Sequence, residues 1–169
     1  MKMRSPLRWL WLTVAIVALD QLTKHLIVNW LGLHESYPIM PGLNLTLVHN
    51  DGAAFSFLQH AGGWQRWFFI GLSIVISAVI LAWLARLRAE RRWLACALSL
   101  ILGGALGNLW DRIMLGYVVD FIVVYYDRWS WPAFNVADSA ITAGAVMLIV
   151  DAIWLDRAEV SVVSKRGGS

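Results

Sequence analysis

The sequence has little charge and almost no cysteine. Only 15% of its 169 residues are charged, whereas 59% are hydrophobic, and the mean hydropathy is +0.62. This composition excludes an ordinary soluble globular domain and indicates a membrane protein. The one cysteine, Cys96, lies inside an apolar run, so no disulfide can form within the chain and no cysteine-type metal spacing exists. We interpret Cys96 as a small buried residue.

The positive charge does not indicate nucleic-acid binding. The net charge is +3, but the basic residues cluster between apolar runs instead of covering one face. We therefore expect no nucleic-acid partner. The N-terminal stretch has the basic and apolar regions of a secretory signal, yet no small-x-small cleavage pair follows it, so we expect it to remain as a first membrane span.

Four apolar runs each approach the roughly 20 residues that a helix needs to cross a bilayer. They cover residues of about 9–31, 67–85, 93–112 and 138–156. The sequence therefore predicts an all-α integral membrane protein with four transmembrane helices. We expect residues 1–169 to form a single membrane domain with a cytoplasmic tail at about 158–169.

The basic residues predict the orientation of these helices. Ten of the 14 Lys and Arg lie on one side of the predicted membrane: Lys2, Arg4, Arg8, Arg86, Arg88, Arg91, Arg92, Arg157, Lys165 and Arg166. By the positive-inside rule this side is the cytoplasm, so both termini are predicted there. The 11 tryptophans fall near the predicted ends of the helices, which is typical of an interfacial belt.

Two longer connections, residues 32–63 and 113–137, are then predicted outside the cytoplasm. In the first, Leu43, Leu45 and Leu47 alternate with polar residues before an Asn-Asp-Gly turn, and Phe55 and Phe57 follow it. This alternation is typical of a hairpin. We therefore expect a small extracytoplasmic β-sheet cradle at about 38–58.

Small residues recur at every fourth position of the third predicted helix, at Ala95, Ser99, Gly103 and Gly107. They form a flat stripe, against which another helix should pack closely. Packing explains this stripe fully, so we assign no chemistry to it.

Two aspartates stand at the same predicted depth. Arg157 and Asp138 are 19 residues apart, about 28 Å of helix, which places Asp138 at the outer interface, and Asp120 lies in the adjoining excursion. Two carboxyl groups forced together share a proton, and this is the electrostatic basis of an aspartyl protease. The structural alternative is that Asp138 only caps the last helix.

Further polar residues lie near these aspartates. Asp20 and Lys24 have the favourable order for an ion pair and either support a site or neutralise each other. Asn108, Asp111 and Arg112 form a polar cluster at the end of the third helix. A serine protease is disfavoured because the spans that carry Ser73, Ser77 and Ser99 contain no histidine, and a zinc site is weakly supported because the four histidines are irregularly spaced.

Several segments, taken together and in order, resemble the lipoprotein signal peptidases, also called signal peptidase II. They are LDQLTK, VHNDGAAF, GGALGNLWDR, VVDF and FNVADS, and they extend from the first span to the last. The resemblance implies a bacterial inner-membrane aspartyl endopeptidase that cleaves diacylglyceryl-modified prolipoproteins immediately before the lipidated cysteine. It implies that the site faces the outer leaflet, that no cofactor or metal is needed, and that globomycin-type peptides inhibit.

The resemblance also assigns residues. Asp120 and Asp138 are the implied catalytic pair, and the implied binding or supporting residues are Asp20, Lys24, Asn50, Gly52, Asn108, Arg112 and Asn135. Membrane lipids are expected around a protein that we expect to be a monomer. Two alternatives remain from the residues alone: a small transporter or lipid-binding protein that uses the aspartates to gather protons or cations, and a purely structural membrane subunit.

Overall fold

The computed structural model describes residues 6–52 and 63–155. Within these ranges, four helices are long and apolar enough to cross a membrane. The helical elements are η1 (Pro6–Trp9), α1 (Leu10–Trp30), α2 (Trp64–Arg86), α3 (Arg92–Met114), α4 (Val136–Val150) and its continuation η2 (Asp151–Leu155). Each predicted span is therefore a helix, although α2 begins three residues earlier and α3 ends two residues later than expected. The predicted tail lies outside the described residues.

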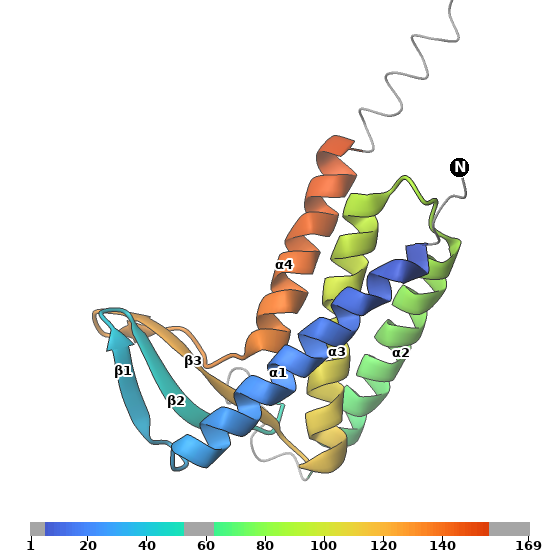
Figure 1. The fold of residues 1–169 in the computed structure, drawn as a ribbon. Coiled ribbons are helices and arrows are strands. Elements are labelled where there is room, and N and C mark those ends of the chain that lie inside the picture. Colours follow the sequence, from blue (N-terminus) through green and yellow to red (C-terminus); the bar gives the residue numbers. More distant parts are fainter. Residues whose placement is uncertain (1–5, 53–62, 156–169) are drawn as a thin grey trace, which may run out of the picture.

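The helices run side by side, and their connections divide the molecule into two ends (Figure 1). The start of α1, the turn between α2 and α3 and the end of α4 lie together at one end, whereas the sheet lies at the other. Arg86, Arg88, Arg91 and Arg92 belong to the first end. These four belong to the ten basic residues that were predicted to share one side, and the assignment of that end to the cytoplasm stays a prediction.

Helix α3 is the centre of the bundle. Its most apolar window is 67% buried inside the protein, whereas the corresponding windows of the other three helices are 17% to 22% buried. Leu94, Leu98 and Leu102 pack with Ile80 and Leu84 of α2 to form one core cluster. The outward faces of the other helices carry large exposed apolar side chains, as expected for surfaces that contact lipid.

The predicted small-residue stripe on α3 receives α1, which confirms close packing there. A Cβ atom on Gly103 would lie 2.8 Å from Ile16, and one on Gly107 would lie 2.7 Å from Oδ2 of Asp20. The hydroxyl of Thr13 donates a hydrogen bond of 3.0 Å to the carbonyl oxygen of Ser99. The close approach of the two backbones is what brings Asp20 against α3.

The sheet has four antiparallel strands in the order β1-β2-β3-β4. The strands are β1 (Ser36–Met40), β2 (Leu43–Asn50), β3 (Val118–Tyr126) and β4 (Trp129–Ser130). The expected cradle at 38–58 is thus present in its first part, while residues 53–58, with Phe55 and Phe57, lie outside the described residues. Strands β3 and β4 were not predicted, and β3 pairs with β2 across the middle of the sheet.

The sheet is fixed to the bundle through a second apolar cluster. Ile27 and Leu31 at the end of α1 pack against Leu47 of β2 and against Val119 and Phe121 of β3. The chain then returns through Phe134, whose backbone pairs with Ile122, before α4 begins. As a result, the start of β3 and the start of α4 lie beside the same ends of α1 and α3.

Candidate active site

Asp120 and Asp138 converge around Asn135. Asp120 is the third residue of β3 and only 1% exposed, whereas Asp138 is half-buried in the first turn of α4. The side-chain amide of Asn135 donates a 2.7 Å hydrogen bond to Oδ1 of Asp120, and its backbone N–H donates to Oδ2 of Asp138 at 3.2 Å. One residue thus contacts both carboxyl groups that the sequence proposed as partners.

Asn135 is also the cap of α4. Its Oδ1 accepts a 2.9 Å hydrogen bond from the backbone N–H of Asp138, and with the reciprocal bond this makes a capping box. Asp138 therefore does take part in capping the last helix, as the structural alternative expected, although the N-cap residue is Asn135. Capping occupies only Oδ2, however, and holds the side chain in one orientation with Oδ1 toward α3.

The second oxygen of Asp120 is held from the sheet. Asn50, the last residue of β2, donates from its amide to Oδ2 of Asp120 at 2.8 Å. The Oδ1 of Asn50 in turn accepts a 2.9 Å bond from the backbone N–H of Gly52. Gly52 has φ of +104°, a conformation that favours glycine, so this turn depends on the absence of a side chain.

The surroundings of Asp120 favour its protonated form. Burial, followed by the nearby Asp138, raises the pKa of Asp120 from 3.8 to about 7. The hydrogen bonds from Asn50 and Asn135 and the charge of Lys24 act in the opposite direction. Asp120 therefore changes its charge near neutral pH, which is the property that a general acid or base requires.

Asn108 links α3 to Asp138 and to the ion pair on α1. Its amide donates a 2.7 Å hydrogen bond to Oδ1 of Asp138. Its Oδ1 accepts bonds from the Lys24 ammonium and from the Asn135 amide, each of 3.1 Å. The orientation of the Asn108 amide is thus set by two donors, and this directs its own NH₂ group toward Asp138.

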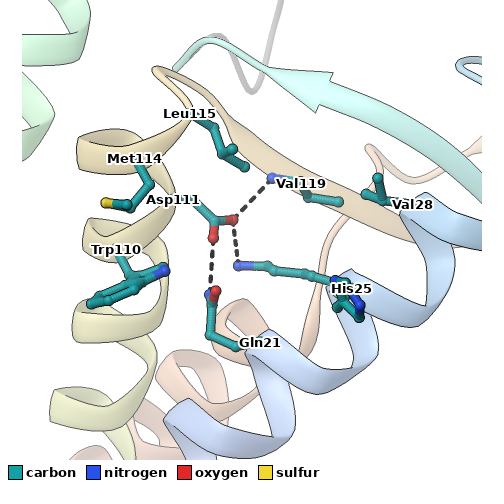
Figure 2. A pocket seen from close by; sticks show the side chains of 9 residues that line it. Gln21, His25, Val28, Trp110, Asp111, Met114, Leu115 and Val119 are labelled. Atoms are coloured by element: carbon teal, nitrogen blue, oxygen red, sulfur yellow. Dashed lines mark hydrogen bonds and ion pairs between the residues drawn. The ribbon is translucent and has the colours of Figure 1, made fainter.

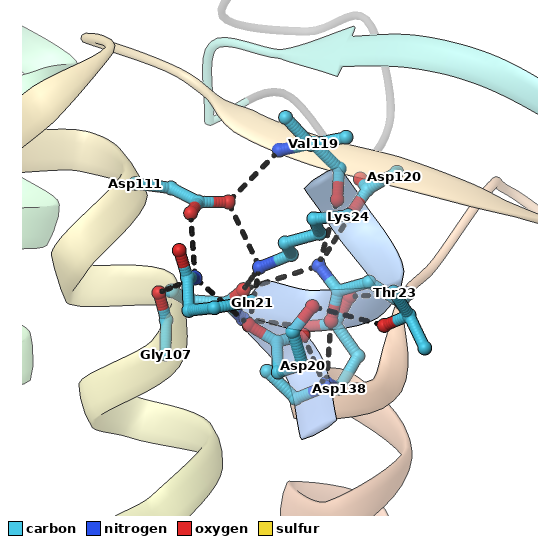
Figure 3. Close-up of polar contacts among 12 residues, drawn as sticks. Asp20, Gln21, Thr23, Lys24, Gly107, Asp111, Val119, Asp120 and Asp138 are labelled. Carbon is cyan, nitrogen blue, oxygen red and sulfur yellow. Dashed lines mark hydrogen bonds and ion pairs between the residues drawn. The ribbon is translucent and has the colours of Figure 1, made fainter. Parts of the chain in front are cut away.

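The predicted ion pair between Asp20 and Lys24 is present, and Asp111 completes it. The Lys24 ammonium lies 2.7 Å from Oδ2 of Asp20 and 2.8 Å from Oδ2 of Asp111, and all three residues are almost fully buried (Figure 3). With the bond to Asn108, the three N–H groups of Lys24 each have an acceptor.

Asp20 and Asp111, the two partners of Lys24, also hold the backbone next to the candidate catalytic residues. Oδ1 of Asp20 accepts the backbone N–H of Ala137 in the first turn of α4 at 2.9 Å. Oδ2 of Asp111 accepts the backbone N–H of Val119 at 3.1 Å (Figure 3). Ala137 and Val119 directly precede Asp138 and Asp120. The ion pair therefore does more than neutralise charge, since it anchors the backbone beside each candidate catalytic residue.

Arg112 faces the aspartates from the end of α3. Its guanidinium interacts electrostatically with Asp138, Asp120 and Asp111, in that order of strength. One of its N–H groups donates to the carbonyl oxygen of Asn108 at 3.3 Å, and the ring of Phe69 lies 5.0 Å from its central carbon. The site thus holds a cation close to both candidate carboxyl groups.

A cavity of about 230 Å³ lies between α1, α3 and the start of β3, and Lys24 and Asp111 line it (Figure 2). Gln21 and Asp111 provide polar atoms to its wall, and Val28, Met114 and Leu115 provide apolar ones. Gln21 donates to Oδ1 of Asp111 at 2.9 Å and also to Asp20 at 3.2 Å. Gln21 therefore fixes the relative position of the two acids.

The structure brings together all nine predicted site residues and adds three. The additions are Gln21, Asp111 as a partner of Lys24, and Phe69. Gln21 adjoins Asp20 and Asp111 belongs to the predicted polar cluster, so the sequence contained a signal for both. Phe69 gave none, because it lies in an uncharged run rich in large apolar residues. Within the described ranges, no group of three or more His, Cys, Asp and Glu side chains is arranged to hold a metal ion.

Comparison with known proteins identifies the family of the chain. The family profile described as signal peptidase (SPase) II matches residues 12–154. The chain belongs to the signal peptidase II family. The family suggested by the sequence motifs is thereby confirmed. Together with the four apolar helices, membership of the signal peptidase II family identifies a multi-pass membrane protein.

Relatives from several bacteria match along most of their length. The lipoprotein signal peptidase of Pseudomonas syringae pv. tomato is 56% identical over 147 residues, which are 86% of this chain and 85% of that protein. That of Alteromonas mediterranea is 50% identical and matches 86% of this chain and 80% of its own. A bacterial membrane enzyme solved by the in meso method at 2.3 Å resolution has a TM-score of 0.78 and 32% identity, with 90% of each chain covered.

Proposed function

We propose that this signal peptidase II family member is a membrane-embedded aspartyl endopeptidase with Asp120 and Asp138 as its catalytic pair. Its substrates are diacylglyceryl-modified prolipoproteins, and it cleaves immediately before the lipidated cysteine. The observation that carries the mechanism is the convergence of the two carboxyl groups on Asn135, one buried with a raised pKa and one half-buried. The relatives' shared name, lipoprotein signal peptidase, supports the substrate class.

The two environments support different roles in the reaction. Asp120 is the buried partner and holds the shared proton in the resting enzyme, because burial penalises its charged form. Asp138 is more accessible and starts as the carboxylate, with Arg112 and the Asn108 amide stabilising its charge. In a coupled pair this division describes the dominant proton arrangement.

The two aspartates exchange protons with the attacking water and with the substrate. Asp138 takes a proton from the water whose oxygen attacks the scissile carbonyl carbon, while Asp120 gives its proton to the carbonyl oxygen. The resulting gem-diol breaks its C–N bond as Asp138 donates its proton to the leaving nitrogen of the cysteine. Asp120 recovers a proton from the diol, so both groups return to their starting states.

The position of the site suits a substrate that is held in the bilayer. If the sheet end faces the outer leaflet, as the basic residues predict, the acyl chains stay in lipid while the peptide crosses the two aspartates. The path of the peptide is then lined by Asn50, Gly52, Asn108, Arg112 and Asn135. Asp20 and Lys24 support these residues without lining the path. In this orientation the protein spans the bacterial inner membrane with both termini in the cytoplasm.

Purified protein should be incubated with a diacylglyceryl-modified precursor peptide and with the same peptide lacking the lipid. The wild type should cleave only the lipidated peptide, before its cysteine, and globomycin should inhibit it. Asp120→Asn and Asp138→Asn should each lower kcat by at least about 10³-fold with unchanged folding, because each removes one proton-transfer group. Normal turnover by either variant would exclude that residue from catalysis.

A further inference from the structure

The first residues of helix α2 contact two neighbours of the aspartates, namely Arg112 and the turn at Gly52. Arg66 and Phe69 lie on the first two turns of α2, at the sheet end of the bundle. Arg66 reaches the end of α3, and Phe69 reaches Arg112 and the turn at Gly52. Neither residue is assigned a role by the catalytic chemistry above.

Arg66 satisfies backbone groups where α3 ends. Its Nε donates to the carbonyl oxygen of Arg112 and one terminal nitrogen donates to that of Ile113, both at 2.9 Å. The last carbonyls of a helix have no partner within it, so a side chain that binds two of them fixes the final turn. That turn carries Arg112 and leads through Gly116, with φ of +93°, into β3 and Asp120.

Phe69 is a shared support for two neighbours of the aspartates. Its ring lies under the guanidinium of Arg112, with 5.0 Å from the ring centre to the central carbon. The same ring lies so near Gly52 that a Cβ atom there would come within 2.5 Å of it. Gly52 belongs to the turn that orients Asn50 toward Asp120. One aromatic face therefore bounds the position of both Arg112 and the Asn50 turn.

We propose that the start of α2 is a positioning element of this active site, in which Arg66 fixes the last turn of α3 and Phe69 holds the Arg112 guanidinium against the two aspartates. This inference rests on the proposed function, and it adds two residues that act through Arg112 without touching the reacting atoms. Loss of the aromatic face releases Arg112 toward solvent and weakens its attraction to the carboxylates.

The sign of the resulting pH effect follows from the charges around the pair. Arg112 and Lys24 favour the ionised aspartates, while Asp120 and Asp138 oppose each other's ionisation, and Asp111 and Asp20 lie behind Lys24. Moving Arg112 away removes one nearby cation and leaves Lys24. Protons then leave the pair at higher pH, so the whole pH–rate profile should move upward.

The test compares Phe69→Leu, which keeps an apolar side chain but loses the ring, with Phe69→Tyr, which keeps the ring. Phe69→Leu should lower kcat about 3- to 30-fold, change KM less, and move the pH–rate profile upward. Phe69→Tyr should keep the wild-type kcat and the wild-type pH–rate profile. Arg66→Gln should behave like Phe69→Leu, with partial recovery in Arg66→Lys, because a lysine replaces only one of two directed bonds.

Matched controls come from the opposite end of the same helix. Trp83→Leu and Arg86→Gln remove an aromatic and a guanidinium from α2 far from the aspartates, and they should leave the profile unchanged. A wild-type profile in Phe69→Leu would overturn the proposal. A uniform loss of activity at every pH that Phe69→Tyr does not restore would also overturn it, because that is the behaviour of a merely structural residue.

A second measurement separates failure of this inference from failure of the proposed function. The protonated Asp120 carboxyl can be followed by infrared difference spectroscopy during a pH titration, with its band assigned by loss in Asp120→Asn. The midpoint should be higher in Phe69→Leu than in the wild type, whether or not any peptide is cleaved. Equal midpoints would disprove the positioning role even in an active peptidase.

Discussion

The side-chain NH₂ group of Asn135 donates a 2.7 Å hydrogen bond to Oδ1 of Asp120. The side-chain oxygen of Asn135 accepts from the backbone N–H of Asp138 and so caps α4. A single asparagine thus connects the formation of α4 to the orientation of a buried carboxyl group in β3. The two functions use different atoms of the same amide. They can therefore be separated by substitution.

Asn135→Ser should separate them, because serine supplies a capping oxygen but no amide donor. Asn135→Ser should keep the stabilising contribution of the cap and lose only that of the amide bonds, whereas kcat should fall roughly 10- to 100-fold because Asp120 loses the amide that holds its Oδ1. Asn135→Ala should lose the same activity and also about 1 kcal/mol of stability from the missing cap. Thermal unfolding in detergent and steady-state kinetics measure both. Full activity in Asn135→Ser would show that its amide is not needed by Asp120.

The raised pKa of Asp120 predicts a pH dependence of stability. Its pKa is 3.8 in the unfolded chain and about 7 in the folded protein. The folded state therefore binds the extra proton, and its stabilising contribution is complete below about pH 4 and is lost as the pH rises toward 7. Asp120→Asn removes this dependence. Relative to the wild type, the variant should become progressively more stable between about pH 4 and 7, measured as the difference in unfolding temperature. A constant difference across that range would show that Asp120 has an ordinary pKa.

The sequence predicted the local features of this fold well. The apolar length of each helix, the stripe on α3 and the Asp20–Lys24 pair depend on residues only a few positions apart, and all are present. Strand β3 depends on pairing with β2, and the hydrogen bond between Asn50 and Asp120 joins residues separated by 70 positions. Its sequence, VVDFIVVYY, has no clear alternation, so its β-branched residues alone did not identify a strand.

The candidate site shows the same division. Polar residues in an apolar chain are conspicuous, and this singled out the aspartates and their amide partners. Phe69 has the same appearance in the sequence as any lipid-facing residue of α2, and only tertiary packing places it under Arg112. Likewise, the attachment of Asp111 to Lys24 depends on how α1 and α3 cross, which residue spacing does not specify.

Lys24 should be essential for folding as well as for the site. Lys24→Met leaves Asp20 and Asp111 buried without a cation, and breaking a buried ion pair costs about 3–5 kcal/mol. We expect a strongly lowered unfolding temperature in detergent. Asparagine at positions 20 and 111 removes the two unpaired charges. The triple variant Lys24→Met, Asp20→Asn, Asp111→Asn should therefore recover much of the lost stability. If the triple variant is no more stable than Lys24→Met, the charges are not the cause.

Gly104 determines how closely α4 approaches α3, and it gives the sharpest test of the packing that positions Asp138. A Cβ atom on Gly104 would overlap the carbonyl oxygen of Ala137, the residue just before Asp138, so the start of α4 must move to accommodate it. Gly104→Ala should cost about 1–3 kcal/mol through overpacking and should lower kcat as Asp138 shifts away from Asn108. Gly71→Ala is the matched control, because a Cβ atom at Gly71 of α2 meets nothing within 4 Å. Alanine is the better helix former by about 1 kcal/mol, so Gly71→Ala should equal or exceed the wild type in stability and retain full activity. If the two variants have the same unfolding temperature and turnover, the contact between α3 and α4 does not determine the position of Asp138.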